Sequence, residues 1–425
     1  MTDLPESDSS VVDEATPVRR NLALATLGLS TFMSYTAVLP VFGSRLLEFF
    51  SITNEQFGNL MGLQLLGRLP TLMAVGPLIG RLGVRRVIET GLAGMGVSFL
   101  IMGLAHRLLG LQAGLLIRGL SVGLVTVALP AFLIALYPAL KRRMVAVHLV
   151  AFAAPAILYP LVAGRLLRWS STGGDRAFAV VLYAPFLIIG VIMIFGAVAL
   201  GLFKQEQVRA QVEAPSTINP RALLSVFPLV IMLLIVLHGA ADTAVYNFMA
   251  MFMADHFQHL PIAPEWALAG HGIAYVITRT TLAVLPERLG QRAILTLAGP
   301  IGGLIIIAGF WWGGPIGVPI AYTIGCLFIA AEYPVLVSEI SSRSLGHFGS
   351  VFAAGSLLLQ VASWALLRVT GRIADITGGY RLSLTVAALG FVAFGLIAAV
   401  TGLGKPRPDS LADSVDSSQP VSNES

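Results

Sequence analysis

Charged side chains are scarce in this sequence. Of its 425 residues only 12% are Asp, Glu, Lys or Arg, whereas 56% are hydrophobic and the mean hydropathy is +0.83. A soluble globular chain is nearer half apolar and a quarter charged, so this composition excludes an ordinary soluble domain. Apolar segments separated by short polar connections indicate a polytopic membrane protein instead, because about 20 apolar residues span a bilayer as a helix.

Cysteine is almost absent as well. The single Cys326 lies inside an apolar segment, which excludes a disulfide framework and a cysteine metal site. The sequence has no phosphate-binding loop, no His/Cys cluster with metal-ligand spacing and no nucleophile constellation. We therefore expect no enzyme activity, no ATP-driven transport and no cofactor. The net charge of +5 does not predict nucleic-acid binding, because the basic residues lie in short loops between apolar segments.

Twelve apolar segments are long enough to cross a membrane. They lie at about 20–43, 56–80, 87–106, 111–138, 145–168, 177–203, 222–253, 264–286, 291–312, 316–337, 346–369 and 380–403. Their lengths favour helices over the roughly 10-residue alternating strands of an outer-membrane barrel. The predicted fold class is an all-α polytopic membrane protein with twelve transmembrane helices, which we expect to be a monomer in the lipid bilayer.

Lysine and arginine residues predict the orientation of the chain. If the N-terminus is inside, sixteen of the 27 Lys and Arg residues fall in inside connections, eight fall outside and three lie within the spans. The first twenty residues lack the basic-then-apolar pattern of a secretion signal. The two-to-one bias predicts a multi-pass protein of the plasma (bacterial inner) membrane with both termini in the cytoplasm.

Two landmarks recur at one offset along the chain. Arg81-Leu82-Gly83 returns as Arg288-Leu289-Gly290 (288 − 81 = 207), and Gly164-Arg165 returns as Gly371-Arg372 (371 − 164 = 207). Parallel six-helix halves of this kind are a known transporter construction. We predict these divisions: a disordered tail at 1–18, an N-terminal half at 19–203, a polar linker at 204–221, a C-terminal half at 222–403 and a second disordered tail at 404–425.

The sequence resembles the major facilitator superfamily over about residues 20–403. The turn GPLIGRLGVRR at 76–86 is similar to the family's loop between helices 2 and 3, and LPERLGQR is its counterpart in the second half. The segment from Arg118 to Gly123 is similar to the arginine motif of helix 4. The resemblance implies the family's fold, secondary transport and gating turns; the turn residues concerned are Gly76, Gly83, Arg85, Glu287, Arg288 and Gly290.

Two positions depart from the family pattern. The acidic residue of the loop motif would fall at Gly80, whereas Glu287 fills the matching position of the second half. In the family this acid is thought to latch the cytoplasmic gate. The helix 5 motif of proton-coupled exporters retains only Pro160 and Gly164 here, so it does not assign an exporter.

Five ionisable residues interrupt the spans, and such residues are functional candidates because each costs a few kcal/mol to insert. They are Arg68, Arg118, Asp242, Arg279 and Glu332. Arg68 lies 13 residues from Arg81, about 20 Å along a helix, too far for its side chain to reach the membrane surface.

Arg68 and Arg279 lie on the repeat-related helices 2 and 8 and are predicted to face each other across a cavity. This resembles the superfamily's anion porters, including the nitrate/nitrite group, although segments 145–168 and 346–369 lack the asparagines of the nitrate signature. Either the two arginines bind an anion, which their forked guanidinium groups suit, or they pair with carboxylates and backbone carbonyls.

Asp242 and Glu332 are the candidate proton sites. His238 precedes Asp242 by four residues and shares its helix face, and a carboxylate beside an imidazole is suited to proton exchange near neutral pH. Glu332 is followed by Pro334, which weakens helix 10. In the family Arg118 is associated with proton coupling or gating. The alternative is that the two acids are counter-ions of the three arginines.

Tyr35, Gln64, Tyr246 and Asn247 are expected to complete the substrate site. The preferred function is secondary active transport, by symport or antiport with protons, of a small solute; one arginine in excess of the acids favours an anion. Broad efflux of hydrophobic compounds and a non-transporting sensor or scaffold on a transporter fold are the alternatives.

Overall fold

The computed structural model describes residues 17–137, 141–202, 225–257, 262–284, 290–343 and 348–404. The predicted tails and the predicted linker fall almost entirely on 1–16, 203–224 and 405–425, outside the described residues.

Each of the twelve predicted segments contains helix. The first half consists of α1 (Pro17–Thr31), η1 (Phe32–Val38), α2 (Gly43–Phe50), α3 (Asn54–Leu82), α4 (Val84–Leu104), α5 (Leu108–Leu136), α6 (Lys141–Ser170) and α7 (Gly174–Leu202). The second half consists of α9 (Val226–His256), α10 (Glu265–Val284), α11 (Gln291–Ala293), η3 (Ile294–Ala298), α12 (Gly299–Trp312), α13 (Gly317–Ile329), α14 (Glu332–Arg343), α15 (Phe348–Thr377) and α16 (Tyr380–Thr401).

Nine helices of the described residues are long and apolar enough to cross a membrane, or ten if the bent pair Arg20–Val38 and Gly43–Phe50 is one span. The two parts of this pair meet at 65°. The helices α6 and α10, of 30 and 20 residues, stand outside that count. The prediction of an all-helical multi-pass membrane protein is confirmed.

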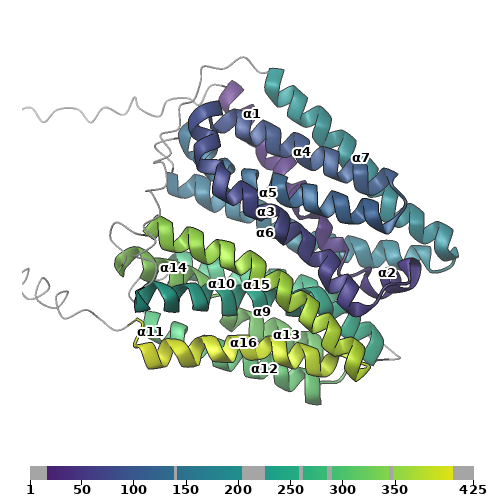
Figure 1. Ribbon diagram of the computed structural model, residues 1–425, viewed down its shortest axis with the longest axis vertical. Helices are drawn as coiled ribbons and strands as arrows, with labels where there is room; N and C mark the ends of the chain where they lie inside the picture. The colour runs from purple at the N-terminus through teal and green to yellow at the C-terminus, as the bar shows by residue number, and fades with distance from the viewer. Residues whose placement is uncertain are drawn as a thin grey trace, which may run out of the picture.

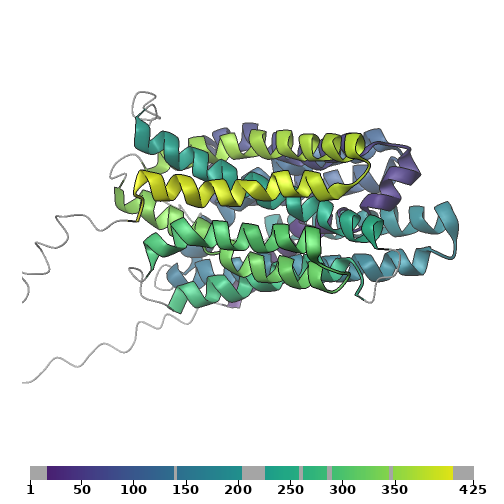
Figure 2. The same ribbon diagram turned by 90° about the horizontal axis from the view of Figure 1, so that it is seen from below.

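The two halves lie one above the other in Figure 1, with α1 to α7 in purple to blue-teal and α9 to α16 in teal to yellow. Figure 2 shows that the long helices of both halves run along one common direction. The start of α1 and the end of α16 lie at the same end of the molecule, as an even number of spans requires.

The internal repeat is visible in the helix bounds. The helices α6 and α15 both have 30 residues, and both their starts and their ends differ by 207 (348 − 141 and 377 − 170). Gly83 and Gly290, also 207 apart, both adopt positive φ values, +83° and +74°. Only glycine tolerates such angles readily, which explains why both turns contain it.

The halves meet through α3 against α15 and α6 against α10. A Cβ atom on Gly58 would lie 2.2 Å from the Leu367 carbonyl oxygen, and one on Gly371 would lie 2.1 Å from that of Asn54. These glycines therefore allow backbone-to-backbone contact. We call the end of the molecule where α3 begins the Asn54 end, and the opposite end the Gly83 end.

Polar contacts also join the halves at the Asn54 end. Asp375 in α15 accepts hydrogen bonds from the backbone N–H groups of Asn54 (3.0 Å) and Glu55 (2.9 Å), at the start of α3. Arg368 pairs with Glu55 at 2.7 Å, and Arg168 of α6 pairs with Glu265 of α10. A carboxylate at a helix N-terminus satisfies free N–H groups and the helix dipole. The contacts close this end of the protein.

Three spans are interrupted where the buried charges lie. The first span changes from α1 to the 3-10 helix η1, and the ninth contains the π-helical segment η3. The tenth breaks between Ile329 and Glu332, two residues before Pro334, as the proline predicted. Such interruptions release backbone groups and space for polar side chains within a membrane.

Candidate functional site

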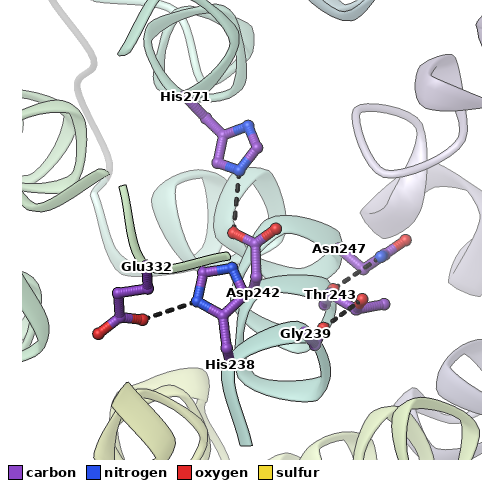
Figure 3. A network of polar contacts seen from close by, with 7 residues as sticks. All are labelled: His238, Gly239, Asp242, Thr243, Asn247, His271 and Glu332. Atoms are coloured by element: carbon purple, nitrogen blue, oxygen red, sulfur yellow. Dashed lines mark hydrogen bonds and ion pairs between the residues drawn. The ribbon is translucent and has the colours of Figure 1, made fainter. Parts of the chain in front are cut away.

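A buried histidine–carboxylate pair lies in the second half. The Nδ1 atom of His238 on α9 is 2.7 Å from an Oε atom of Glu332, the first residue of α14 (Figure 3). Both side chains are buried. A Cβ atom on Gly299 would lie 2.2 Å from the other carboxylate oxygen, so this glycine, just after the π-helical segment, makes room for Glu332.

A second pair lies one helical turn further along α9. The Nε2 atom of His271 on α10 is 3.0 Å from an Oδ atom of Asp242 (Figure 3). The sequence placed Asp242 beside His238, and the two do share one face of α9. The hydrogen bond to Asp242, however, is formed by His271, whereas His238 is hydrogen-bonded to Glu332.

Tyrosines surround the second pair. The rings of Tyr275 and Tyr246 lie 4.3 Å and 5.0 Å from the His271 ring. The Tyr246 hydroxyl and the Nδ1 atom of His271 are buried and have no hydrogen-bond partner in the described residues. Asn247 donates its own amide to the Thr243 carbonyl at 2.8 Å. The pair is therefore enclosed by groups that still have hydrogen bonds to make.

Arg118 lies at the centre of the first half. It is buried on α5 and donates to the Gln64 side chain on α3 and to the Met33 carbonyl on η1. Both acceptors are neutral, and the Arg118 Nε atom has no partner in the described residues. The alternative reading, in which Arg118 pairs with an acid, therefore finds no described carboxylate to form that pair.

Arg68 on α3 lies next to Arg118. Gln64, which accepts a hydrogen bond from Arg118, lies one helical turn before Arg68 on α3, and no described side chain accepts a hydrogen bond from Arg68. The neighbouring residues Gly67 and Gly119 hold the helices together here, since a Cβ atom on Gly119 would lie 2.2 Å from the Gln64 carbonyl oxygen.

Arg279 is not brought to Arg68 by any described contact. Its side chain is exposed, and its guanidinium group lies over the Tyr275 ring at 4.9 Å from the ring centroid. The arginine that lies near Arg68 in the described residues is Arg118, and the expectation that Arg68 and Arg279 face each other stays a prediction.

The other predicted residues have varied surroundings. Tyr35 is buried in an aromatic cluster and contacts Tyr159 at 5.2 Å between ring centroids. Arg85 binds Glu89 and the Leu200 carbonyl, all within the first half. Gly76 is inside α3. Glu287 and Arg288 lie outside the described residues.

His271 and Tyr275 are the site residues that sequence reasoning left out. With Arg279 they form an i, i+4, i+8 series on one face of α10. That periodicity is a signal visible in the sequence, although it does not specify Asp242 as the partner.

Comparisons with known proteins agree on the fold. The family model described as Major Facilitator Superfamily matches residues 24–367. A structure of the transporter FucP in the outward conformation covers 91% of this chain and 99% of its own at 17% identity, with a TM-score of 0.62. The E. coli fucose:proton symporter FucP aligns at 16% identity over 91% and 99%, with a TM-score of 0.61.

A bacterial homologue of the human lysosomal transporter Spinster, inward-facing and occupied, aligns at 14% identity over 92% of this chain and 99% of its own, with a TM-score of 0.68. A search of curated proteins finds no significant match. The identities are low, so these structures support the fold and leave the solute open.

Proposed function

Because the chain belongs to the major facilitator superfamily and is a secondary transporter, we propose that it couples the movement of a small anionic solute to protons. The two six-helix halves would rock about a site between them, as expected for alternating access in this fold. Because Lys and Arg are more frequent in the connections on the side of the termini, we place both termini on the cytoplasmic side of a plasma membrane.

The observation that carries the proton coupling is the presence of two histidine–carboxylate contacts in the second half, one of them buried and the other partly buried. A carboxylate inside a membrane is costly unless it is protonated or paired, so such groups mark proton pathways in transporters. His238–Glu332 and His271–Asp242 together provide four groups that bind protons.

The two pairs are connected through α9. His238 and Asp242 are four residues apart on one helix face, and Figure 3 shows their side chains between Glu332 and His271. A proton taken up at one pair thus has neighbouring sites to which it can pass. We assign Asp242 the coupling role, because the Tyr246 hydroxyl and the Nδ1 atom of His271 beside it have no hydrogen-bond partner among the described residues.

Two further observations support this function. Arg68 and Arg118 bring two positive charges into the first half without a described acid, which favours an anionic solute. One structural neighbour is the E. coli fucose:proton symporter, so the fold is compatible with proton coupling. Its sugar substrate is not carried over to this chain.

The test uses purified protein in proteoliposomes with an imposed pH gradient. Asp242→Asn should retain solute counterflow and lose pH-driven accumulation, because the amide binds no proton. Asp175→Asn is the matched control: it removes an exposed acid that pairs only with Arg45, and it should leave both activities intact. Unchanged pH-driven uptake by Asp242→Asn would remove this residue from the coupling step.

A further inference from the structure

No carboxylate of the described residues pairs with Arg68 or Arg118. The first half, residues 19–203, contains only four acidic residues, and each is bonded elsewhere. Glu48 and Asp175 contact Arg45, Glu89 contacts Arg85 and Glu55 contacts Arg368. Two neighbouring cations inside the spans, one buried and one partly exposed, repel each other, and the cost is high in a medium that screens poorly. This arrangement indicates a site that a mobile anion completes.

The close helix crossing builds this site. Gly67 precedes Arg68 on α3, and Gly119 follows Arg118 on α5. A Cβ atom on Gly67 would lie 2.2 Å from the Leu116 carbonyl oxygen, and one on Gly123 would lie 2.1 Å from the Thr71 hydroxyl. The glycines thus let the two backbones touch, which holds both arginines at one depth.

The free hydrogen-bond donors suit a planar anion. Arg118 uses two N–H groups on Gln64 and Met33 and keeps its Nε–H free, whereas Arg68 keeps its whole fork. The Arg68 side chain is partly exposed, so a ligand can reach it. Both residues lie in helix interiors, where backbone N–H groups are already bonded and cannot cradle a phosphate. A guanidinium fork matches a carboxylate.

We propose that Arg68 and Arg118 bind the carboxylate group of the transported solute, and that Arg279 lies outside this site. The proposal rests on the proposed transport function and names its substrate class as small organic carboxylates. The carboxylate binds in the first half and the proton in the second. The two ligands therefore act on different halves, and both can affect the movement of one half relative to the other.

Acetate is the probe, because it is the smallest stable carboxylate with a carbon side chain. Purified full-length protein in detergent is unfolded by heat over a range of acetate concentrations at constant ionic strength. We expect a saturable rise in the unfolding temperature, since a ligand that binds only the folded state stabilises it. Acetamide, of the same shape and without charge, should give no rise.

The variants locate the effect. Arg68→Gln should weaken acetate binding by about ten-fold or more, the usual loss for a hydrogen bond to a charged group. Arg118→Lys keeps the charge and loses the planar fork, so it should also weaken binding. Arg279→Gln is the matched control and should bind as the unmodified protein does. Without acetate, Arg68→Gln should unfold at a higher temperature, because the repulsion with Arg118 is gone.

Three results would overturn the proposal. They are a non-saturable acetate effect, an equal effect in Arg68→Gln, and stronger stabilisation by inorganic phosphate or chloride than by acetate at equal ionic strength. The measurement needs no pH gradient. If acetate binds as expected and Asp242→Asn still accumulates solute, the coupling assignment fails and the site stands. If Asp242→Asn behaves as expected and acetate does not bind, the coupling assignment stands and the carboxylate site fails.

Discussion

Glu332 and His238 are each other's hydrogen-bond partners inside a span, at 2.7 Å and with both side chains buried. Removing one member leaves the other polar group unpaired in a low-dielectric environment. Removing both leaves no such group. The stability lost when both side chains are removed should therefore differ from the sum of the losses in the two single variants.

We predict that Glu332→Leu and His238→Leu each lower the free energy of unfolding by roughly 3–5 kcal/mol. The double variant should lose less than the sum of the two, by about 1–3 kcal/mol, as contacting residues do. Denaturant unfolding in detergent measures all four proteins. The same cycle on the exposed pair Arg45 and Asp175 is the control and should give a coupling below about 1 kcal/mol. Additive losses at Glu332 and His238 would contradict the pairing.

Single residues show how far sequence reasoning extends. The sequence does reveal the charged residues within the spans, because a charge in an apolar segment is costly to insert and therefore marks a candidate site. They are Arg68, Arg118, Asp242 and Glu332. Their partners cannot be predicted in this way, because helix periodicity indicates only which residues of the same helix share a face. His238 is four residues from Asp242, and yet the bond to Asp242 is made by His271, from another helix.

At the level of elements, α15 caps α3. Thr53 already forms a capping box with Gln56 at the start of α3, and Asp375 adds bonds to the N–H groups of Asn54 and Glu55. The capping box is formed by neighbouring residues of the same half, whereas the Asp375 carboxylate comes from the other half. The additional stabilisation that Asp375 gives to the N-terminus of α3 is thus present only while the Asn54 end is closed.

Asp375→Asn should therefore open the Asn54 end more often. Loss of the charge at a helix N-terminus costs about 1–2 kcal/mol, which is roughly a 5- to 30-fold change in a two-state population. The readout is the rate at which a maleimide labels Ser44→Cys, a residue of the cavity of about 440 Å³ at this end. The native Cys326 is buried and should stay unlabelled.

Asp175→Asn is the control for labelling, because its partner Arg45 lies in the same half. It should leave the rate unchanged. Equal rates in Asp375→Asn and the unmodified Ser44→Cys protein would show that this cap does not restrain the closed end.

The interruptions of the helices were predictable only in part. Pro334 signals a weak tenth span, and the break falls at Glu332, two residues earlier. The π-helical turn at Ile294–Ala298 contains no proline, but Pro300 follows it and has no N–H to donate to the Thr296 carbonyl, so the sequence does carry a signal for this irregularity. Tertiary contacts add to it, since Gly299, directly after the turn, approaches both Glu332 and the Phe391 carbonyl.

Across the whole molecule, the 207-residue offset predicts the two equivalent halves. It also relates the two contacts between them, because α3 and α10, like α15 and α6, occupy matching places. The offset cannot predict which end of these contacts is closed, since both repeats are compatible with either state. In the structure, the glycines at 58 and 371 and the ion pair between Glu55 and Arg368 hold the halves together at the Asn54 end.

Rocking of the halves requires the Asn54 end to open during each transport cycle. Glu55→Cys and Arg368→Cys replace an ion pair between the halves. A short bifunctional thiol reagent that joins them should abolish solute transport in proteoliposomes, because the halves can no longer separate there. It should leave acetate binding intact, because the site at Arg68 remains reachable from the Gly83 end. Arg45→Cys with Asp175→Cys, joined within one half, should transport normally. Full transport by the protein cross-linked between halves would contradict rocking about this end, and loss of acetate binding would place the entrance to the Arg68 site at the Asn54 end.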